Sequence, residues 1–160
     1  MRNLALSVLV LMSSTHVYAL DSSDLSVGVG AFSAENSDCN KCDYIGQTVE
    51  VGYNYTNVLA FDAKYAVGDS AENTDIAMAY VGVNIGHDFG SNDYKLYAKG
   101  GLGNVTENDY SETGFTLGFG GIYAISKDYE GLFIKFESLA LKFQDESVGM
   151  ATSLGLNYLL

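Results

Sequence analysis

The chain contains no proline and no tryptophan, only two cysteines, and few basic residues. Its 160 residues include 8 Lys and Arg against 20 Asp and Glu, which gives a formal net charge of −12. A nucleic-acid-binding protein needs Lys and Arg to neutralise phosphates, so this balance argues against nucleic acid as a partner. Two cysteines are too few for a disulfide-dense scaffold or a four-cysteine zinc site. Beyond the N-terminus, no apolar run approaches the roughly 18–20 residues that a membrane helix requires.

Apolar and small residues are abundant instead. Hydrophobic residues make up 48% of the chain, charged residues only 18%, and 18 positions are glycine. This apolar content can bury a core, which excludes a disordered chain. The length is that of one domain.

The N-terminus has the pattern of an export signal. Arg2 precedes an apolar stretch from Leu4 to Met12, and the segment ending in Ala19 is close to the small-x-small pattern that precedes a cleavage site. We therefore expect residues 1–19 to be a cleaved signal peptide and residues 20–160 to form the mature domain. A buried N-terminal helix is the alternative interpretation.

Period-two alternation dominates the chain from residue 25 onward. In one segment, for example, Val49, Val51 and Tyr53 alternate with Glu50 and Gly52. Strict alternation of this kind is typical of β-strands whose two faces meet different surroundings. Seven segments show it: residues 25–32, 48–55, 59–67, 77–86, 94–103, 115–125 and 148–160.

An eighth segment, residues 132–143, is less regular. Ile134 has one parity, whereas Leu139 and Leu141 have the other. One extra residue in a strand reverses its alternation, so we expect a β-bulge near Ser138 that returns the apolar side chains to one face. With this segment the sequence predicts eight strands.

The connections between the segments alternate in length. Residues 56–58, 88–93 and 126–130 are short, whereas residues 34–44, 68–75 and 104–112 are longer and polar, with 144–147 as a brief fourth member. Short turns at one end and longer loops at the other are typical of outer-membrane barrels. The predicted fold is therefore all-β: an eight-stranded antiparallel up-and-down transmembrane β-barrel.

Glycine and charge indicate which face looks outward. The polar face of the expected strands is rich in glycine, which suits the crowded lumen of an eight-stranded barrel better than a solvated surface. In the seven regular segments no charge falls on the apolar face. In the lumen, the charged residues of the polar face could form a nearly neutral network. These residues are Glu50, Asp62, Lys64, Lys95, Lys99, Lys135 and Glu137.

One alternative reverses the two faces. A soluble periplasmic barrel would turn its apolar face inward around a small apolar ligand. That architecture requires Val51, Phe61, Leu117 and Leu156 to point into the lumen.

The last residues resemble the C-terminal assembly signal of bacterial outer-membrane proteins, polar-x-Gly-x-x-apolar-x-apolar. Ser153, Gly155, Tyr158 and Leu160 match it, although the family usually ends in Phe. With the alternating segments, residues 20–160 resemble the small eight-stranded outer-membrane β-barrel family, which includes the OmpA transmembrane domain and the OmpX/Ail barrels.

The resemblance implies a monomeric protein of a Gram-negative outer membrane. Its expected partners are outer-membrane lipid and lipopolysaccharide, and the barrel assembly machinery inserts it. Its lumen would be plugged by side chains, and its role would be structural, adhesive or loop-mediated binding.

Cys39 and Cys42 lie in the first long connection. In an exported protein we expect them to form a small structural disulfide, with metal capture or thiol exchange as alternatives.

The long connections are acidic. Such a surface keeps an exported chain soluble during transit, or it binds divalent cations, a basic partner or a host ligand. Their acidic residues are Glu35, Asp38, Asp43, Asp69, Glu72, Asp75, Glu107, Asp109, Glu112, Asp145 and Glu146, against Lys41 alone.

Catalysis has little support in the sequence. His87 is the one histidine of the expected mature chain, and no His-x-Ser pair accompanies it. A lipid-modifying barrel enzyme that depends on His87 remains a third possibility. We expect no enzymatic activity, no cofactor and no metal.

Overall fold

The structure is a computed structural model. It describes residues 25–36, 43–56, 58–70, 74–88, 94–107, 110–125, 131–142 and 148–160. These residues form eight strands: β1 (Leu25–Asn36), β2 (Asp43–Asn54), β3 (Leu59–Ser70), β4 (Asp75–Asp88), β5 (Tyr94–Glu107), β6 (Tyr110–Ala124), β7 (Leu132–Lys142) and β8 (Val148–Leu159). Across the described ranges, no helix has the length and apolar character needed to cross a membrane.

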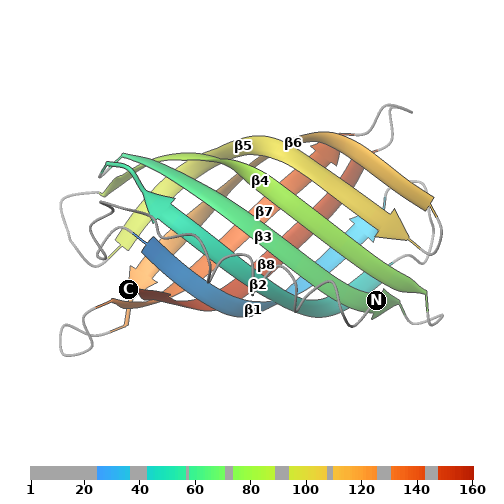
Figure 1. The fold of residues 1–160 in the computed structure, drawn as a ribbon, viewed down its shortest axis with the longest axis horizontal. Coiled ribbons are helices and arrows are strands. Elements are labelled where there is room, and N and C mark those ends of the chain that lie inside the picture. Colours follow the sequence, from blue (N-terminus) through green and yellow to red (C-terminus); the bar gives the residue numbers. More distant parts are fainter. Residues whose placement is uncertain are drawn as a thin grey trace, which may run out of the picture.

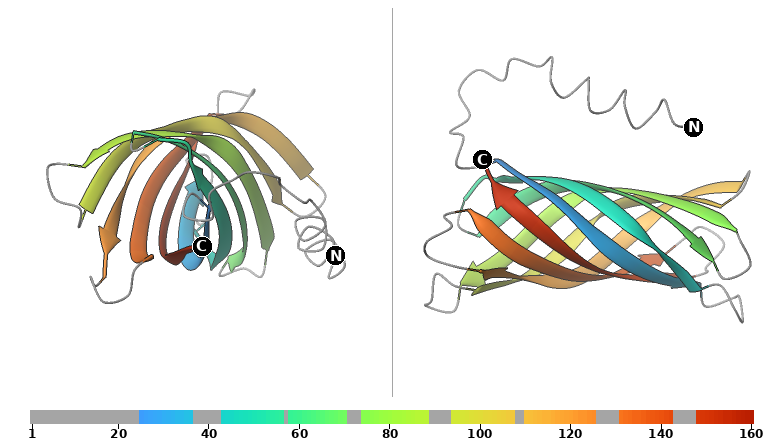
Figure 2. Two further views of the ribbon diagram at one scale, coloured as in Figure 1. Left: turned by 60° about the vertical axis from the view of Figure 1, so that its left-hand side comes forward. Right: turned by 90° about the horizontal axis from the view of Figure 1, so that it is seen from below.

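The strands form one closed antiparallel barrel in chain order, β1 to β8. The first and last strands close it, with Val29 opposite Leu156 and Gly30 opposite Gly155. Figure 1 shows the strands crossing the barrel at a steep tilt, and Figure 2 shows β1 and β8 side by side. The predicted fold class is confirmed: this is the architecture of an eight-stranded transmembrane barrel.

The predicted difference in connection length between the two ends was wrong: 4, 5 and 7 residues separate the strands at one end, and 6, 4, 2 and 5 residues separate them at the other, because the strands continue into the expected loops. We call the end that holds the β2–β3, β4–β5 and β6–β7 connections the turn end; Leu25 and Leu160 also lie there, joined by a hydrogen bond from the Leu160 amide to the Leu25 carbonyl. The opposite end, with the other four connections, is the loop end. The C-terminus marks the turn end on the left of Figure 1.

Alternation along each strand places apolar side chains outside and small or polar ones inside. Phe115 and Leu117 are 74% and 71% exposed on the outer face of β6, whereas Thr116 between them is 1% exposed. Phe61 and Leu156 are also exposed on the outside. These positions contradict the alternative of a soluble barrel with an apolar interior, which required Phe61, Leu117 and Leu156 to point inward.

At the loop end the strands are longer than the sequence predicted. Glu35 pairs with Asp43 across β1 and β2. Glu107 pairs with Tyr110, which leaves only two residues between β5 and β6. Several acidic residues expected in loops therefore stand on strand ends. The prediction ended strands where apolar alternation ends, but backbone pairing continues because polar side chains are tolerated wherever a strand is solvated on its outer face.

Strand β7 corrects the expected bulge. Its pairing with β6 and with β8 is continuous, with Ser138 opposite Phe119 on one side and Thr152 on the other. No residue is inserted, so Leu139 and Leu141 point into the lumen, on the same face as Glu137, and both are buried. The prediction was wrong because it assumed a lumen that is polar along its whole length.

Two glycines meet specific structural needs. At Gly120 in β6, a Cβ atom would lie 2.4 Å from the Tyr97 hydroxyl and 2.6 Å from the Phe136 carbonyl oxygen. The absent side chain makes room for the Tyr97 ring inside the lumen. Gly131, just before β7, has φ of +95°, a conformation that L side chains rarely adopt.

Candidate functional site

The lumen has two chemically different halves. Toward the loop end, apolar side chains fill it, and we call this group the apolar plug. Its buried members are Phe32, Ala34, Tyr44, Ala66, Ile76, Tyr80, Leu139, Leu141 and Ala151. Toward the turn end, six charged side chains meet, and we call them the ionic network. They are Glu50, Asp62, Lys64, Lys99, Lys135 and Glu137.

Glu137 of β7 is the centre of the ionic network. The Nζ atom of Lys99 lies 2.6 Å from its Oε1 atom, and the Nζ atom of Lys135 lies 3.0 Å from the same oxygen. Lys64 binds the second carboxylate oxygen, Oε2. The Tyr97 hydroxyl donates a further hydrogen bond to Oε1 over 2.8 Å. Because Glu137 is only 1% exposed, these partners replace the water that a carboxylate otherwise needs.

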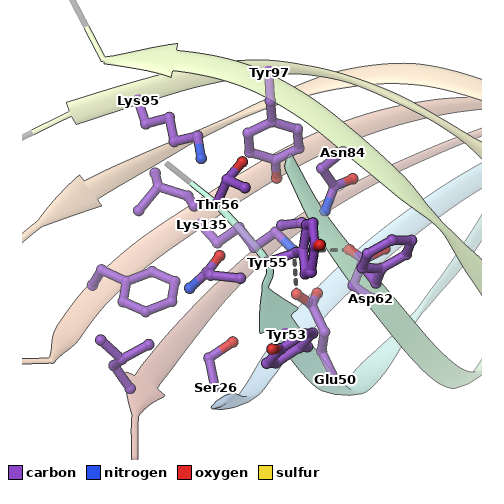
Figure 3. A pocket seen from close by; sticks show the side chains of 17 residues that line it. Ser26, Glu50, Tyr53, Tyr55, Thr56, Asp62, Asn84, Lys95, Tyr97 and Lys135 are labelled. Atoms are coloured by element: carbon purple, nitrogen blue, oxygen red, sulfur yellow. Dashed lines mark hydrogen bonds and ion pairs between the residues drawn. The ribbon is translucent and has the colours of Figure 1, made fainter. Parts of the chain in front are cut away.

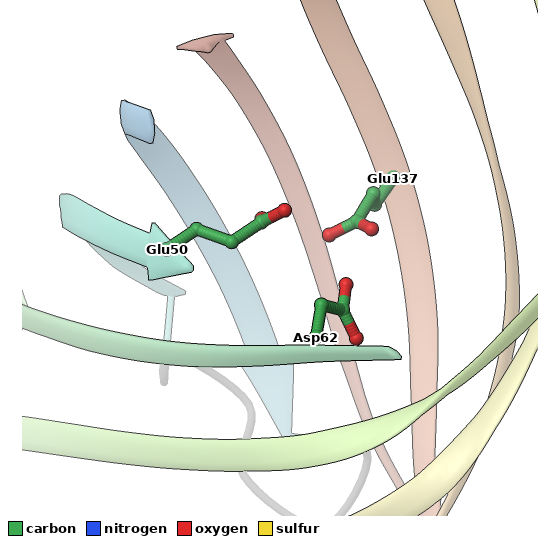
Figure 4. Close-up of side chains that lie close together, drawn as sticks. All are labelled: Glu50, Asp62 and Glu137. Atoms are coloured by element: carbon green, nitrogen blue, oxygen red, sulfur yellow. The ribbon is translucent and has the colours of Figure 1, made fainter. Parts of the chain in front are cut away.

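The remaining contacts tie distant strands together. Lys99 of β5 binds Asp62 of β3 at 2.5 Å. Lys135 of β7 binds Asp62 at 3.0 Å and also pairs with Glu50 of β2. Figure 4 shows the three carboxylates converging from three strands. These strands are mostly not neighbours in the sheet, so the network braces the barrel across its lumen.

Hydroxyl groups and rings complete the environment of the lysines. Lys64 donates a hydrogen bond to the Ser153 hydroxyl of β8 over 2.9 Å. The Nζ atom of Lys99 lies 4.4 Å from the centroid of the Tyr80 ring, within cation–π range. Tyr80 belongs to the apolar plug as well, so its ring forms the boundary between the two halves.

The three carboxylates have a spacing that a metal ion could use. One oxygen from each of Glu50, Asp62 and Glu137 lies within 4.8 Å of the others, and all three residues are buried. Three lysine ammonium groups already stand among these oxygens, so the acidic charge is balanced within the network. Its chemistry is that of a neutral structural cluster rather than of a cation site.

The apolar plug arises from inward positions on at least six strands. Phe32, Ile76, Leu139 and Leu141 are each no more than 7% exposed, and Met78 and Val105 pack against the group. The interior of a small barrel barely holds its own side chains, and here those side chains are apolar. Within the described part of the chain, the plug therefore closes the loop-end half of the lumen.

Several predicted site residues lie elsewhere. Lys95 is on the inner face of β5 near the turn end and is not among the six members of the ionic network. Cys39 and Cys42 fall outside the described residues, as do residues 1–24. His87 lies in β4, but its side chain is outside what the structure describes.

The residues of the expected assembly signal divide between the two faces. Ser153 and Gly155 point into the lumen, whereas Tyr158 and Leu160 are 48% exposed on the outside.

Two kinds of lumen residue were missed by reading the sequence. Tyr80 and Tyr97 share the inward parity of the charged residues, but their hydroxyls were not assigned to the network. The sequence analysis expected side chains to plug the lumen, but it did not identify the apolar residues that do so at the loop end. The signal for the apolar plug was present, since Phe32, Met78 and Leu139 all sit on the polar parity close to the loop end.

Known structures share this architecture. Ail, the attachment invasion locus protein of Yersinia pestis, is 14% identical with a TM-score of 0.63, covering 85% of this chain and 97% of Ail. Neisserial surface protein A is 15% identical with a TM-score of 0.62, covering 88% of this chain and 98% of that chain.

A third solved structure is a domain of a larger protein. The N-terminal barrel domain of Pseudomonas aeruginosa OprF is 15% identical, with a TM-score of 0.60 and coverage of 83% of this chain and 97% of the domain. A comparison with curated proteins gave no match. Residues 4–158 match the family described as the outer membrane protein beta-barrel domain. The chain is a member of this outer-membrane β-barrel family.

Proposed function

We propose that the protein acts through its outer surfaces, as a closed outer-membrane barrel with a structural or loop-mediated binding role at the cell surface. The filled lumen carries this proposal. Apolar side chains occupy its loop-end half and a charge-balanced network crosses its turn-end half. Neither half offers a continuous aqueous path among the described residues, and the network balances its own charges. We therefore propose a role that needs neither a wide pore nor an enzymatic activity.

Export and assembly follow from the same proposal. Residues 1–19 direct the chain out of the cytoplasm, and Ser153, Gly155, Tyr158 and Leu160 are read by the barrel assembly machinery. The turn end then faces the periplasm and the loop end faces outward. In the oxidising space beyond the inner membrane, Cys39 and Cys42 form a disulfide in the first loop. The apolar outer face, including Leu117, contacts outer-membrane lipid.

The charge of the loop end suggests the kind of partner. Four carboxylates are exposed there on the outer face of adjacent strands: Glu35, Asp43, Asp69 and Asp75. Two cross-strand pairs, Glu35 with Asp43 and Asp69 with Asp75, place like charges opposite each other. Lys142 is exposed on the neighbouring part of the rim. An acidic surface of this kind attracts basic partners and repels polyanions.

Comparison with Ail sharpens this point. Ail has been solved in complex with the heparin analogue sucrose octasulfate, a polyanion. The acidic rim of this chain is the wrong sign for such a ligand. We therefore propose that a basic surface ligand, rather than a heparin-like one, binds the loop end.

Two measurements test the proposal. Outer-membrane fractions run on a detergent gel with and without boiling show two mobilities when a closed barrel resists unfolding, because such a barrel has no free edge. In planar bilayers, the purified chain is expected to show no sustained large conductance. A protein found soluble in the periplasm, or a stable wide pore, would contradict the proposal.

Binding is tested on the folded chain in nanodiscs, with heparin and polylysine as probes. We expect polylysine to bind and heparin not to bind, with the polylysine signal falling as salt rises. The matched variant replaces the four rim carboxylates Glu35, Asp43, Asp69 and Asp75 with their amides and should lose most of the polylysine signal. Equal binding of polylysine by this variant would show that the rim is not the binding surface.

A further inference from the structure

A cavity of about 460 Å³ lies inside the turn end of the barrel. Asp62, Asn84, Tyr97 and Lys135 line its walls, and Figure 3 shows their side chains arranged around it. The volume falls within the roughly 300–1,000 Å³ range of small-molecule sites in proteins. Two pockets lined by residues of the apolar plug are much smaller, at about 30 and 50 Å³.

The cavity is closed on its inner side. Beyond Asp62 and Lys135, the next lumen layer contains Glu137 and Lys99, both of which are almost fully buried. The apolar plug lies further along the same axis. A molecule entering from the turn end would therefore stop at the ionic network, so the geometry is that of a binding site rather than of a passage.

The carboxylates of the cavity wall are already balanced. Glu50 and Asp62 belong to the ionic network, whose three carboxylates and three ammonium groups cancel, and Lys95 adds an ammonium group that has an interaction of its own. Lys135 is paired with both carboxylates. Such a wall gives a charged ligand no net attraction, because desolvating that ligand is not compensated by an excess of opposite charge. Neutral ligands with hydrogen-bonding groups suit it better.

Two wall residues also have unused hydrogen-bonding capacity. The Oδ1 atoms of Asp62 and of Asn84 are buried and have no hydrogen-bond partner within the described part of the chain. The residues themselves are only 6% and 7% exposed. A buried acceptor without a partner is costly, and a small rotation of either side chain toward the cavity would let a ligand hydroxyl satisfy it.

Aromatic side chains supply the third feature. Tyr55, Tyr97 and Phe133 line the cavity together with the polar groups; Tyr97 is buried, whereas Tyr55 is exposed. Ring faces pack against the C–H faces of sugar rings, while amide and carboxylate oxygens accept hydrogen bonds from hydroxyls. Orienting polar groups combined with apolar surface are what small-molecule sites use.

From this combination we infer that the turn-end cavity binds a small neutral molecule rich in hydroxyl groups, of the mono- or disaccharide class. This inference goes beyond the proposed surface role and does not depend on the acidic rim. It places a second recognition site at the opposite end of the barrel.

The test uses the full folded chain in detergent micelles and saturation-transfer NMR. Glucose, N-acetylglucosamine and maltose serve as neutral probes, with choline and acetate as charged ones. We expect saturable binding of at least one sugar, with a Kd on the order of 1 mM for a ligand of this size. Choline and acetate should give no saturable signal.

Three variants locate the site. Asn84→Leu removes an acceptor at the wall and should weaken sugar binding about tenfold. Ala60→Trp fills the cavity from the inner face of β3 while keeping its polar groups, and should abolish binding. Thr116→Val is the matched control, since Thr116 is a buried lumen residue outside this cavity, and it should bind sugar as the wild type does. The boiled and unboiled gel confirms that each variant is folded.

Each contrary result overturns the inference. Absence of saturable sugar binding by the folded wild type would mean that the cavity holds only water. Undiminished binding by folded Ala60→Trp would place the sugar elsewhere on the protein. Saturable binding of choline or acetate without any sugar would show that the cavity selects charge. None of these outcomes bears on the loop-end partner.

Discussion

The two halves of the lumen are both filled by side chains, but one half is apolar and the other is charged. In the apolar plug, side chains such as Leu139 and Phe32 fill the space without needing partners. In the ionic network, every charged group needs oppositely charged neighbours, and Glu137 contacts three lysines at once. A buried ion pair is often no more stabilising than apolar residues of similar volume. The comparison therefore indicates that the ionic network determines which strands face each other across the lumen more than it raises the free energy of unfolding.

Removing the central carboxylate should have the largest effect. Glu137→Gln keeps the side-chain volume but leaves three buried lysines facing two carboxylates. We expect the free energy of unfolding to fall by about 3–5 kcal/mol, because an uncompensated buried charge remains. Urea titration of the folded chain in lipid vesicles measures it.

A double variant separates charge balance from lost contacts. Glu137→Leu combined with Lys99→Leu removes one carboxylate and one ammonium group, which restores neutrality. Its destabilisation should be clearly smaller than the sum of the two single leucine variants. An additive result would mean that the network does not act as a unit.

The apolar plug should respond less strongly, and by a different mechanism. Leu139→Ala creates a cavity inside the lumen and should cost about 2–4 kcal/mol. Leu117→Ala in the neighbouring strand is the matched control, since lipid fills the space that the outward side chain leaves. The free energy of unfolding should fall only by the transfer free energy of the apolar atoms that Leu117→Ala removes. The same urea titration measures both variants. Equal losses would indicate that the plug is not packed more tightly than the lipid face.

The smallest effect is expected at the solvated rim of the loop end. Glu35→Gln removes one charge from the Glu35–Asp43 pair, in which two carboxylates lie opposite each other. Like charges in that position are unfavourable, so the variant should gain about 0.2–1 kcal/mol at low salt. The gain should shrink as ionic strength rises. A carboxylate would thus be stabilising when buried among lysines and destabilising when exposed beside another acid.

Much of this fold could be predicted because a barrel strand has a period of two and two different surroundings. Val49 and Val51 lie on the outer face as expected, and Glu50 between them points into the lumen. The partners within the lumen could not be predicted. Lys135 and Glu50 lie 85 positions apart, and only the tilt and closure of the barrel bring their strands opposite each other.

The loop-end half was misread for a related reason. Alternation reveals which residues share a face, but it does not say what chemistry that face has at each height in the barrel. Leu139 and Leu141 have the same parity as Glu137 and therefore share its face. If the lumen were polar along its whole length, only a bulge could have turned these two leucines outward. The lumen instead changes from ionic to apolar along its axis.

The cross-lumen pairing also has a consequence for biogenesis. Lys135 and Glu137 belong to the seventh strand, whereas Asp62 and Lys64 belong to the third. An incomplete sheet that lacks the later strands would hold unpaired charges next to hydrocarbon. We therefore expect partly assembled barrels to be unfavourable and closure to be cooperative, with the C-terminal strands supplying the partners that the earlier strands lack.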